Sequence, residues 1–163
     1  MNRHRWGAVP PPDDLGAVVH GPVLLARGDR IAAGLRCVYA YPTGLSLPFV
    51  VRARGLAADV VARWSSETLA EDPVFPADHE PWSGVRFAVE AGELSGPADP
   101  VGLRGHGGLE DFDAEGLLWV GELPADGLVR LTVSWAEAGL PVSTTDLHLG
   151  DLTGLADRTV ALP

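Results

Sequence analysis

Apolar and polar residues alternate along several segments of the chain, as they do in strands that bury one face. The longest such segment is LSLPFVVRAR (45–54), and GVRFAVEAG (84–92) and LVRLTVSW (128–135) follow the same period. Each segment is therefore predicted to be a strand with one buried face. The residues expected on the buried faces are Leu45, Leu47, Phe49, Val51, Ala53, Val85, Phe87, Val89, Val129, Leu131, Val133 and Trp135.

The rest of the chain carries weaker local patterns. DVVARWSS (59–66) fits either a strand or a short helix, and DLTGLADRT (151–159) predicts one or two helical turns. Pro48 cannot donate to a sheet ladder, so 45–54 is predicted to be an edge strand or to carry a bulge. The remaining predicted segments are strands at 22–27, 29–42, 116–124 and 141–150, a long connection at 67–82, and a glycine- and acid-rich loop at 95–115.

Twenty glycines and fourteen prolines interrupt the 163 residues every few positions, which suits short strands and tight turns better than a helical bundle. We expect one β-rich domain over 22–163, preceded by a proline-interrupted segment at 1–21. The predicted fold is an all-β antiparallel β-sandwich of about eight strands with one short C-terminal helical turn. A partly open β-barrel is the alternative.

The net charge of −10 is unevenly distributed, because residues 61–163 hold five arginines and eighteen acids. This excess of acids argues against nucleic acids and anionic membrane surfaces as partners. A protein partner remains compatible, as does a role in solubility alone. The single cysteine allows no intrachain disulfide, and neither a secretory signal nor a membrane-spanning apolar run is apparent, so a cytoplasmic location is expected.

Several motifs occur in a fixed order: CVYAYPTGLSLPFVVRARG, GVRFAVE, GHGG, and the run from GLLWVGELPADG to VALP. In this order they resemble a family of uncharacterised actinobacterial β-rich proteins, over most of residues 22–163. FAVEAG replaces a family "FADG" turn, and Gly121 and Glu122 stand where the family has Trp-Pro. The resemblance implies β structure and a cytoplasmic location, and it implies no activity.

DFDAEGLLWVGE (111–122) matches the template of a calcium-binding EF-hand loop. The two helices that flank an EF-hand loop are not predicted here. Four glycines within the preceding ten residues disfavour the entering helix, and Pro124 would break the leaving one. We therefore predict that it is not an EF-hand. A weaker alternative is a helix-free Ca²⁺ site on a rim loop, which competes with a solvated acidic loop. Its ligands would be Glu110, Asp111, Asp113 and Glu115.

Catalytic motifs are sparse. GHGG (105–108) is similar to the oxyanion loop of some esterases, which would make His106 catalytic, but G-x-S-x-G is absent and a flexible turn explains the glycines. No two histidines have zinc-site spacing, and the phosphate-loop motif is missing. DHE (78–80) is the better metal candidate among polar loops. Cys37 has apolar neighbours and is predicted to be a buried, inert thiol within a strand.

Two pairs of residues are candidates for ligand binding. Trp64 and Trp82 flank the long connection and would line a cleft, with core packing as the alternative. Arg52 and Arg54 share one strand face and would form an anion site, together with Arg36 or Arg86. The alternative is a solvated face with ion pairs to Glu90 or Glu122.

Two functional hypotheses follow. The first is a non-catalytic binding or assembly module acting through an acidic rim (67–115) or an exposed edge strand, with a protein partner or through self-association. The second is a small-molecule or carbohydrate-binding barrel, with or without enzyme activity, with His106 and nearby acids at its mouth. The missing nucleophile, phosphate and zinc motifs favour the first. No cofactor is expected, calcium being the one candidate.

Overall fold

The computed structural model describes residues 2–3, 6, 13–68, 84–108 and 110–162. These residues form strands β1 to β14, helices α1 and α2, and a short 3₁₀ helix at Ala136–Ala138. The helices are α1 (Leu56–Thr68) and α2 (Leu155–Arg158). The strands are β1 (Asn2–Arg3), β2 (Asp14–Leu15), β3 (Ala17–His20), β4 (Val23–Arg27), β5 (Ile31–Leu35), β6 (Val38–Tyr41), β7 (Gly44–Arg54), β8 (Arg86–Ala91), β9 (Leu94–Ala98), β10 (Val101–Gly107), β11 (Asp111–Val120), β12 (Leu128–Trp135), β13 (Leu140–His148) and β14 (Val160–Ala161).

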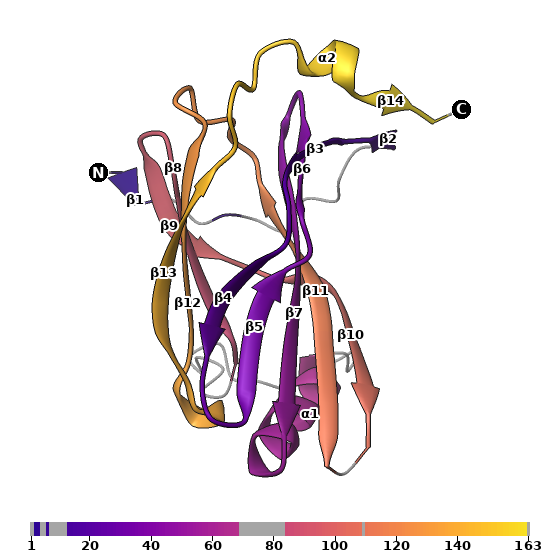
Figure 1. The fold of residues 1–163 in the computed structure, drawn as a ribbon, viewed down its shortest axis with the longest axis vertical. Coiled ribbons are helices and arrows are strands. Elements are labelled where there is room, and N and C mark those ends of the chain that lie inside the picture. Colours follow the sequence, from indigo (N-terminus) through magenta and orange to yellow (C-terminus); the bar gives the residue numbers. More distant parts are fainter. Residues whose placement is uncertain (1, 4–5, 7–12, 69–83, 109, 163) are drawn as a thin grey trace.

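Two large sheets face each other (Figure 1). One has the order β10-β11-β7-β5-β4, with β6 and β3 attached to β7, and the other has the order β1-β9-β8-β12-β13. Apart from β1 with β9, the paired strands run antiparallel, and the sheets of the described residues do not close into a barrel. The predicted all-β antiparallel sandwich is confirmed, with more and shorter strands than expected.

The core lies between the two sheets, and alternating residues of the long strands supply it. Every residue predicted to face inward is buried, with at most 7% of its surface exposed. Phe49 of β7 meets Phe87 of β8 across the sandwich, with ring centroids 4.7 Å apart. Helix α1 packs near one end of the sandwich, where Trp64 lies edge-on to Trp135 at 5.1 Å. Aromatic pairs at these distances add to the stability that burial alone provides.

The predicted strand at 29–42 is wrong in one respect, because it breaks at Arg36 and Cys37 into β5 and β6. This break explains how β7 can contain Pro48 without being an edge strand. Strand β7 is central rather than at an edge, and the carbonyl of Pro48 accepts a hydrogen bond from Arg36 N at 3.1 Å, on the side where the break lies. A strand residue's N–H points to the same side as its carbonyl, so the missing N–H of proline removes no ladder bond.

Other segments differ from the sequence prediction in type or extent. Of the two alternatives predicted for 59–66, the helix is the one observed, as part of the thirteen-residue α1. The loop predicted at 95–115 is instead mostly strand, formed by the end of β9, β10 and the start of β11. The segment 1–21 contributes β1, β2 and β3. None of the described helices has the length and apolar composition needed to cross a bilayer.

Candidate functional site

The outer face of the seven-stranded sheet carries most of the candidate residues. In the pairing of β7 with β11, Arg54 stands opposite Asp111 and Arg52 opposite Asp113. Their side chains form ion pairs, with Arg54 Nε 3.2 Å from Asp111 Oδ1 and Arg52 Nε 3.6 Å from Asp113 Oδ1. The predicted solvated face with cross-strand ion pairs is present, but its partners lie on β11 and not at Glu90 or Glu122.

Glu115 continues this row of charges. Arg36 donates to its carboxylate at 3.2 Å, and His106 Nε2 of β10 lies 3.7 Å from the other carboxylate oxygen. Register places His106 opposite Asp113 and Arg104 opposite Glu115. We call the outward residues of β7, β11 and β10 the charged face: Arg52, Arg54, Arg104, His106, Asp111, Asp113 and Glu115.

This geometry bears on the calcium candidates. Asp111, Asp113 and Glu115 lie on a strand instead of a rim loop, and each has an arginine partner. The carbonyl of Glu110 accepts a hydrogen bond from Gly55 N at 2.8 Å. Within the described part of the chain, no three His, Cys, Asp or Glu residues are grouped so as to hold a metal ion. The segment 111–120 is a single strand, which does not supply the flanking helices of an EF-hand.

Strand β10 forms the edge of this sheet, and Figure 1 shows it at the margin beside β11. Gly108 N donates to the carbonyl of Asp111 at 2.9 Å, which makes this a hydrogen-bonded pair of the antiparallel ladder. Because such pairs alternate, His106 and Arg104 also bond to β11, and the N–H and C=O groups of Gly105 and Gly107 point away from the sheet. Between Arg104 and Gly107, where the register with β11 is regular, the outward positions are therefore glycines.

Arg104 differs from the other arginines of the charged face. Arg52 and Arg54 have carboxylate partners, whereas no ion pair links Arg104 to another described residue. Glu115, which stands opposite Arg104, is engaged by Arg36 and His106. Sequence analysis did not single out Arg104, although its spacing of two from His106 in a strand pattern would have placed both on one face.

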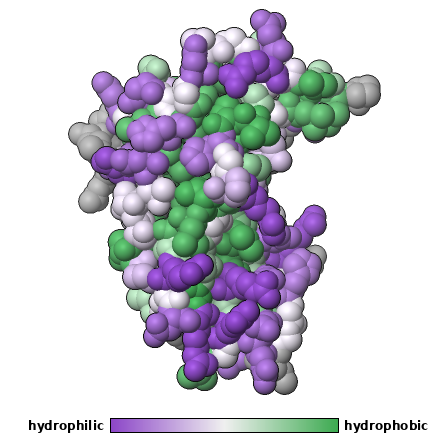
Figure 2. All heavy atoms as spheres, viewed as in Figure 1, coloured by the Kyte–Doolittle hydropathy of each residue, from purple (hydrophilic) through white to green (hydrophobic). Residues whose placement is uncertain are grey.

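An apolar hollow adjoins the charged face. Its volume is about 320 Å³, and Figure 2 shows the exposed apolar surface that runs along β3, β4 and β5. A second hollow of about 550 Å³ lies at the ends of β12 and β13 and includes Arg86, Ser134 and Glu137. Neither contains His106 or Trp64. The first hollow is lined chiefly by Pro22, Leu24, Ala32, Gly34, Val50 and Arg52.

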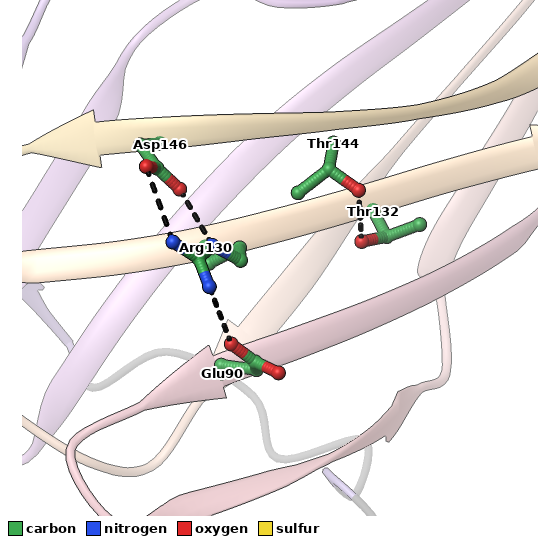
Figure 3. Close-up of polar contacts among 5 residues, drawn as sticks. All are labelled: Glu90, Arg130, Thr132, Thr144 and Asp146. Carbon is green, nitrogen blue, oxygen red and sulfur yellow. Dashed lines mark hydrogen bonds and ion pairs between the residues drawn. The ribbon is translucent and has the colours of Figure 1, made fainter.

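The outer face of the five-stranded sheet carries a polar ladder that joins three strands (Figure 3). Arg130 of β12 donates to both carboxylate oxygens of Asp146 on β13, at 2.8 and 3.4 Å, and to Glu90 of β8 at 3.5 Å. The hydrogen bonds from Arg130 hold the pKa of Asp146 below its usual value. Thr132 and Thr144 hydroxyls meet at 2.9 Å. These groups satisfy one another, which indicates a role in strand register.

The remaining candidates are scattered. Trp64 is buried in the core, with 7% of its surface exposed, while Trp82 and DHE (78–80) lie outside the described residues. Cys37 was expected in a buried strand, but it is half-buried in the break between β5 and β6. Its hydrogen bond with Tyr39 raises the pKa of that phenol. No nucleophile–base pair is formed by these residues.

Comparison of the chain with models of protein families, with curated proteins and with solved structures finds no match. The resemblance to the actinobacterial family stays a prediction, and functional inference rests on the geometry above.

Proposed function

We propose that the protein is a non-catalytic binding module that takes up an extended segment of a partner protein as an additional strand along β10. The observation that carries this proposal is the edge position of β10, which pairs with no described strand on its outer side and whose outward positions between Arg104 and Gly107 are Gly105 and Gly107. In strand addition, main-chain hydrogen bonds supply affinity and neighbouring side chains supply specificity. The N–H and C=O groups that an edge strand leaves unpaired are a template on which another chain can pair.

The charges next to the edge define the chemistry of the partner. Across the sheet, arginines of β7 face carboxylates of β11, and β11 in turn faces Arg104 and His106 of β10. A further strand that continues this alternation carries a carboxylate opposite Arg104. Such a cross-strand pair contributes about 0.2–1 kcal/mol. The net charge of the protein opposes an acidic ligand only weakly, since charges beyond about 8 Å are screened at physiological salt.

Self-association through the same edge has less support. Antiparallel pairing of two β10 strands would bring the cationic Arg104 side chains of both copies onto one face, and like charges opposite each other destabilise a sheet. The barrel hypothesis also has less support, because His106 lies 65% exposed on a sheet face and lines neither hollow. The partner of β10 is therefore a different protein with an extended acidic segment.

The test is a binding titration by fluorescence anisotropy with a labelled peptide of about ten residues in which Val and Glu alternate. The wild type should bind it more tightly than the Val–Lys counterpart. Arg104→Glu should weaken binding roughly two- to thirtyfold, because it removes the favourable pair and adds a repulsion of similar size. Arg63→Glu, which reverses an exposed arginine on α1, serves as the matched control and should leave binding unchanged.

A second variant separates main-chain from side-chain recognition. Gly105→Pro removes an N–H that points away from β11, so it should abolish peptide binding while the fold is retained. Circular dichroism and a thermal melt check the fold. Equal binding of both peptides, or binding unaffected by both Arg104→Glu and Gly105→Pro, would refute the proposal.

A further inference from the structure

The apolar hollow on the outer face of the seven-stranded sheet lies over β4, β5 and β7. Leu24, Gly34 and Val50 form one row across these strands, and Gly34 leaves a depression between the two larger side chains. Leu24 is 54% exposed, although it is a large apolar residue. Figure 2 shows the apolar surface here, with hydrophilic side chains at its lower end. Exposed apolar surface bordered by polar groups is typical of binding sites.

Two arginines stand at one end of this hollow. Arg27 of β4 is the register partner of Ala32 in β5, and Ala32 is in turn the partner of Arg52 in β7. Directly opposed residues of an antiparallel ladder share a face, so both arginines lie on the outer face. Their Cα atoms are two strand spacings apart, about 10 Å, with the methyl group of Ala32 between them. Arg52 also lines the hollow.

Both guanidinium groups retain donors for an anion. Within the described part of the chain, the Arg27 side chain has neither an ion pair nor a hydrogen bond. Arg52 Nε lies 3.6 Å from Asp113 Oδ1, which is longer than a hydrogen bond, and this oxygen has no hydrogen-bond partner among the described residues. Asp113 lies on β11, on the side of Arg52 that faces away from Ala32. The space over Ala32 is therefore a cationic position.

We propose that this hollow binds a small carboxylate that carries an aliphatic tail. The carboxylate lies over Ala32 between Arg27 and Arg52, because planar guanidinium groups match the geometry of a carboxylate. The tail lies over Gly34, between Leu24 and Val50. These two rows are two residues apart along the strands, roughly 7 Å, which suits a chain of medium length such as that of octanoate.

The site is independent of the strand addition proposed above. The hollow lies over β4, β5 and β7, whereas β10 is at the opposite edge of the same sheet. The two proposals also require different ligands, since one takes an extended peptide through main-chain hydrogen bonds and the other takes a small amphiphilic anion. Either one can therefore fail without affecting the other.

The test is a titration of the ¹⁵N-labelled protein with octanoate, followed by two-dimensional NMR. A small ligand on an open surface is expected to bind weakly, with a Kd of about 1 mM, so the titration extends to about 20 mM. The amide signals of Ala32, Gly34 and Val50 should shift and saturate together, while those of β12 and β13 should not. Acetate supplies the carboxylate without the tail, and octylamine supplies the tail with a positive charge. Neither should reproduce the saturating shifts.

Variants separate the contribution of each part of the site. Arg27→Gln should weaken octanoate binding about two- to fivefold, the effect of losing one exposed ion pair. Ala32→Glu places a carboxylate of the chain itself between the two arginines and should abolish saturable binding. Arg63→Gln on α1 is the matched control for loss of one arginine and should bind as the wild type does. The amide spectra themselves show whether each variant is folded.

Three outcomes would overturn the proposal. The first is the absence of saturable shifts with octanoate, and the second is an equal response to octylamine or to acetate, which would mean that head group and tail are not recognised together. The third is binding that neither Arg27→Gln nor Ala32→Glu changes, because the octanoate would then lie elsewhere on the protein.

Discussion

The indole nitrogen of Trp6 donates a hydrogen bond to the backbone carbonyl of Val89, 83 positions further along the chain. This bond lies inside the core, where an unpaired indole N–H or carbonyl would cost stability. It also joins a residue near the start of the sequence to β8, which lies between β9 and β12 in its sheet. Substitutions of Trp6 therefore test whether this contact between distant parts of the chain stabilises the fold.

Trp6→Ala should destabilise the protein by about 3–5 kcal/mol, because it removes a buried ring and leaves a cavity. Trp6→Phe should cost less, since most of the apolar contact remains and the hydrogen bond to Val89 is lost. Urea unfolding followed by circular dichroism measures both. A loss below about 1 kcal/mol for Trp6→Ala would mean that the buried Trp6 side chain contributes little to the fold in solution.

The parts of the fold that could be predicted are those in which burial and strand geometry share one period. In β7, β8 and β12 every second side chain is apolar, so the inner faces were identified correctly from residues such as Phe49, Phe87 and Leu131. The helical turns at α2 were also predicted correctly. Helix α1 remained ambiguous, because DVVARWSS is too short to distinguish helical from strand periodicity.

The parts that could not be predicted depend on contacts between distant residues. Asp111, Asp113 and Glu115 alternate with Phe112 and Ala114 as strand residues do, but the same acidic positions also fit the template of a calcium loop. Their strand partners are Arg54, Arg52 and Val50 of β7, which are distant in the sequence. Their spacing therefore resembled a metal loop. Trp6 has no local pattern at all, since its partner is Val89. The edge position of β10 likewise follows from sheet order, which one sequence does not specify.

Two glycines in neighbouring loops, one before β12 and one after β13, provide a matched test of backbone strain. Gly127 and Gly150 both have positive φ, 69° and 75°, but a Cβ on Gly127 would lie 2.3 Å from the carbonyl oxygen of Gly150, whereas a Cβ on Gly150 meets nothing within 4 Å. Gly150→Ala should cost about 1–2 kcal/mol from strain alone. Gly127→Ala should cost at least about 1 kcal/mol more, because the clash also disturbs the 2.7 Å bond from Leu149 N to Gly127 O. Equal midpoints in urea would contradict the close approach.

The pKa of Asp146 should depend on Arg130. The hydrogen bonds from Arg130 lower this pKa, so replacing Arg130 by Gln should raise it towards the usual value of about 3.9. The pKa of Asp151 is lowered by hydrogen bonds from Thr153 and should stay unchanged, which makes it an internal control. Carboxyl chemical shifts followed by NMR from pH 7 to pH 2 measure both groups.

The hydrogen-bonded pair of Arg130 and Asp146 also predicts that the wild type and Arg130→Gln differ in how their stability depends on pH in acid. A carboxyl group whose pKa is lowered on folding stabilises the protein above its unfolded pKa, and this stabilisation is lost as pH falls through the folded pKa. The wild type should therefore lose more stability than Arg130→Gln below about pH 4. Parallel urea titrations at several pH values compare the two, and identical acid dependence would show that the bond between Arg130 and Asp146 is not maintained in solution.

Calcium should leave the thermal midpoint unchanged, because Asp111 and Asp113 are paired with arginines and lie on a strand. A site with a Kd near 10 μM would instead add about 2.7 kcal/mol at hundredfold excess and raise the midpoint by several degrees. Melts in EDTA and in about 1 mM CaCl₂ distinguish these outcomes, with Asp146→Ala on the opposite sheet as a control for general loss of charge. A calcium-dependent rise that Asp111→Ala removes and Asp146→Ala retains would show that the ion pairs of the charged face open to admit a metal ion.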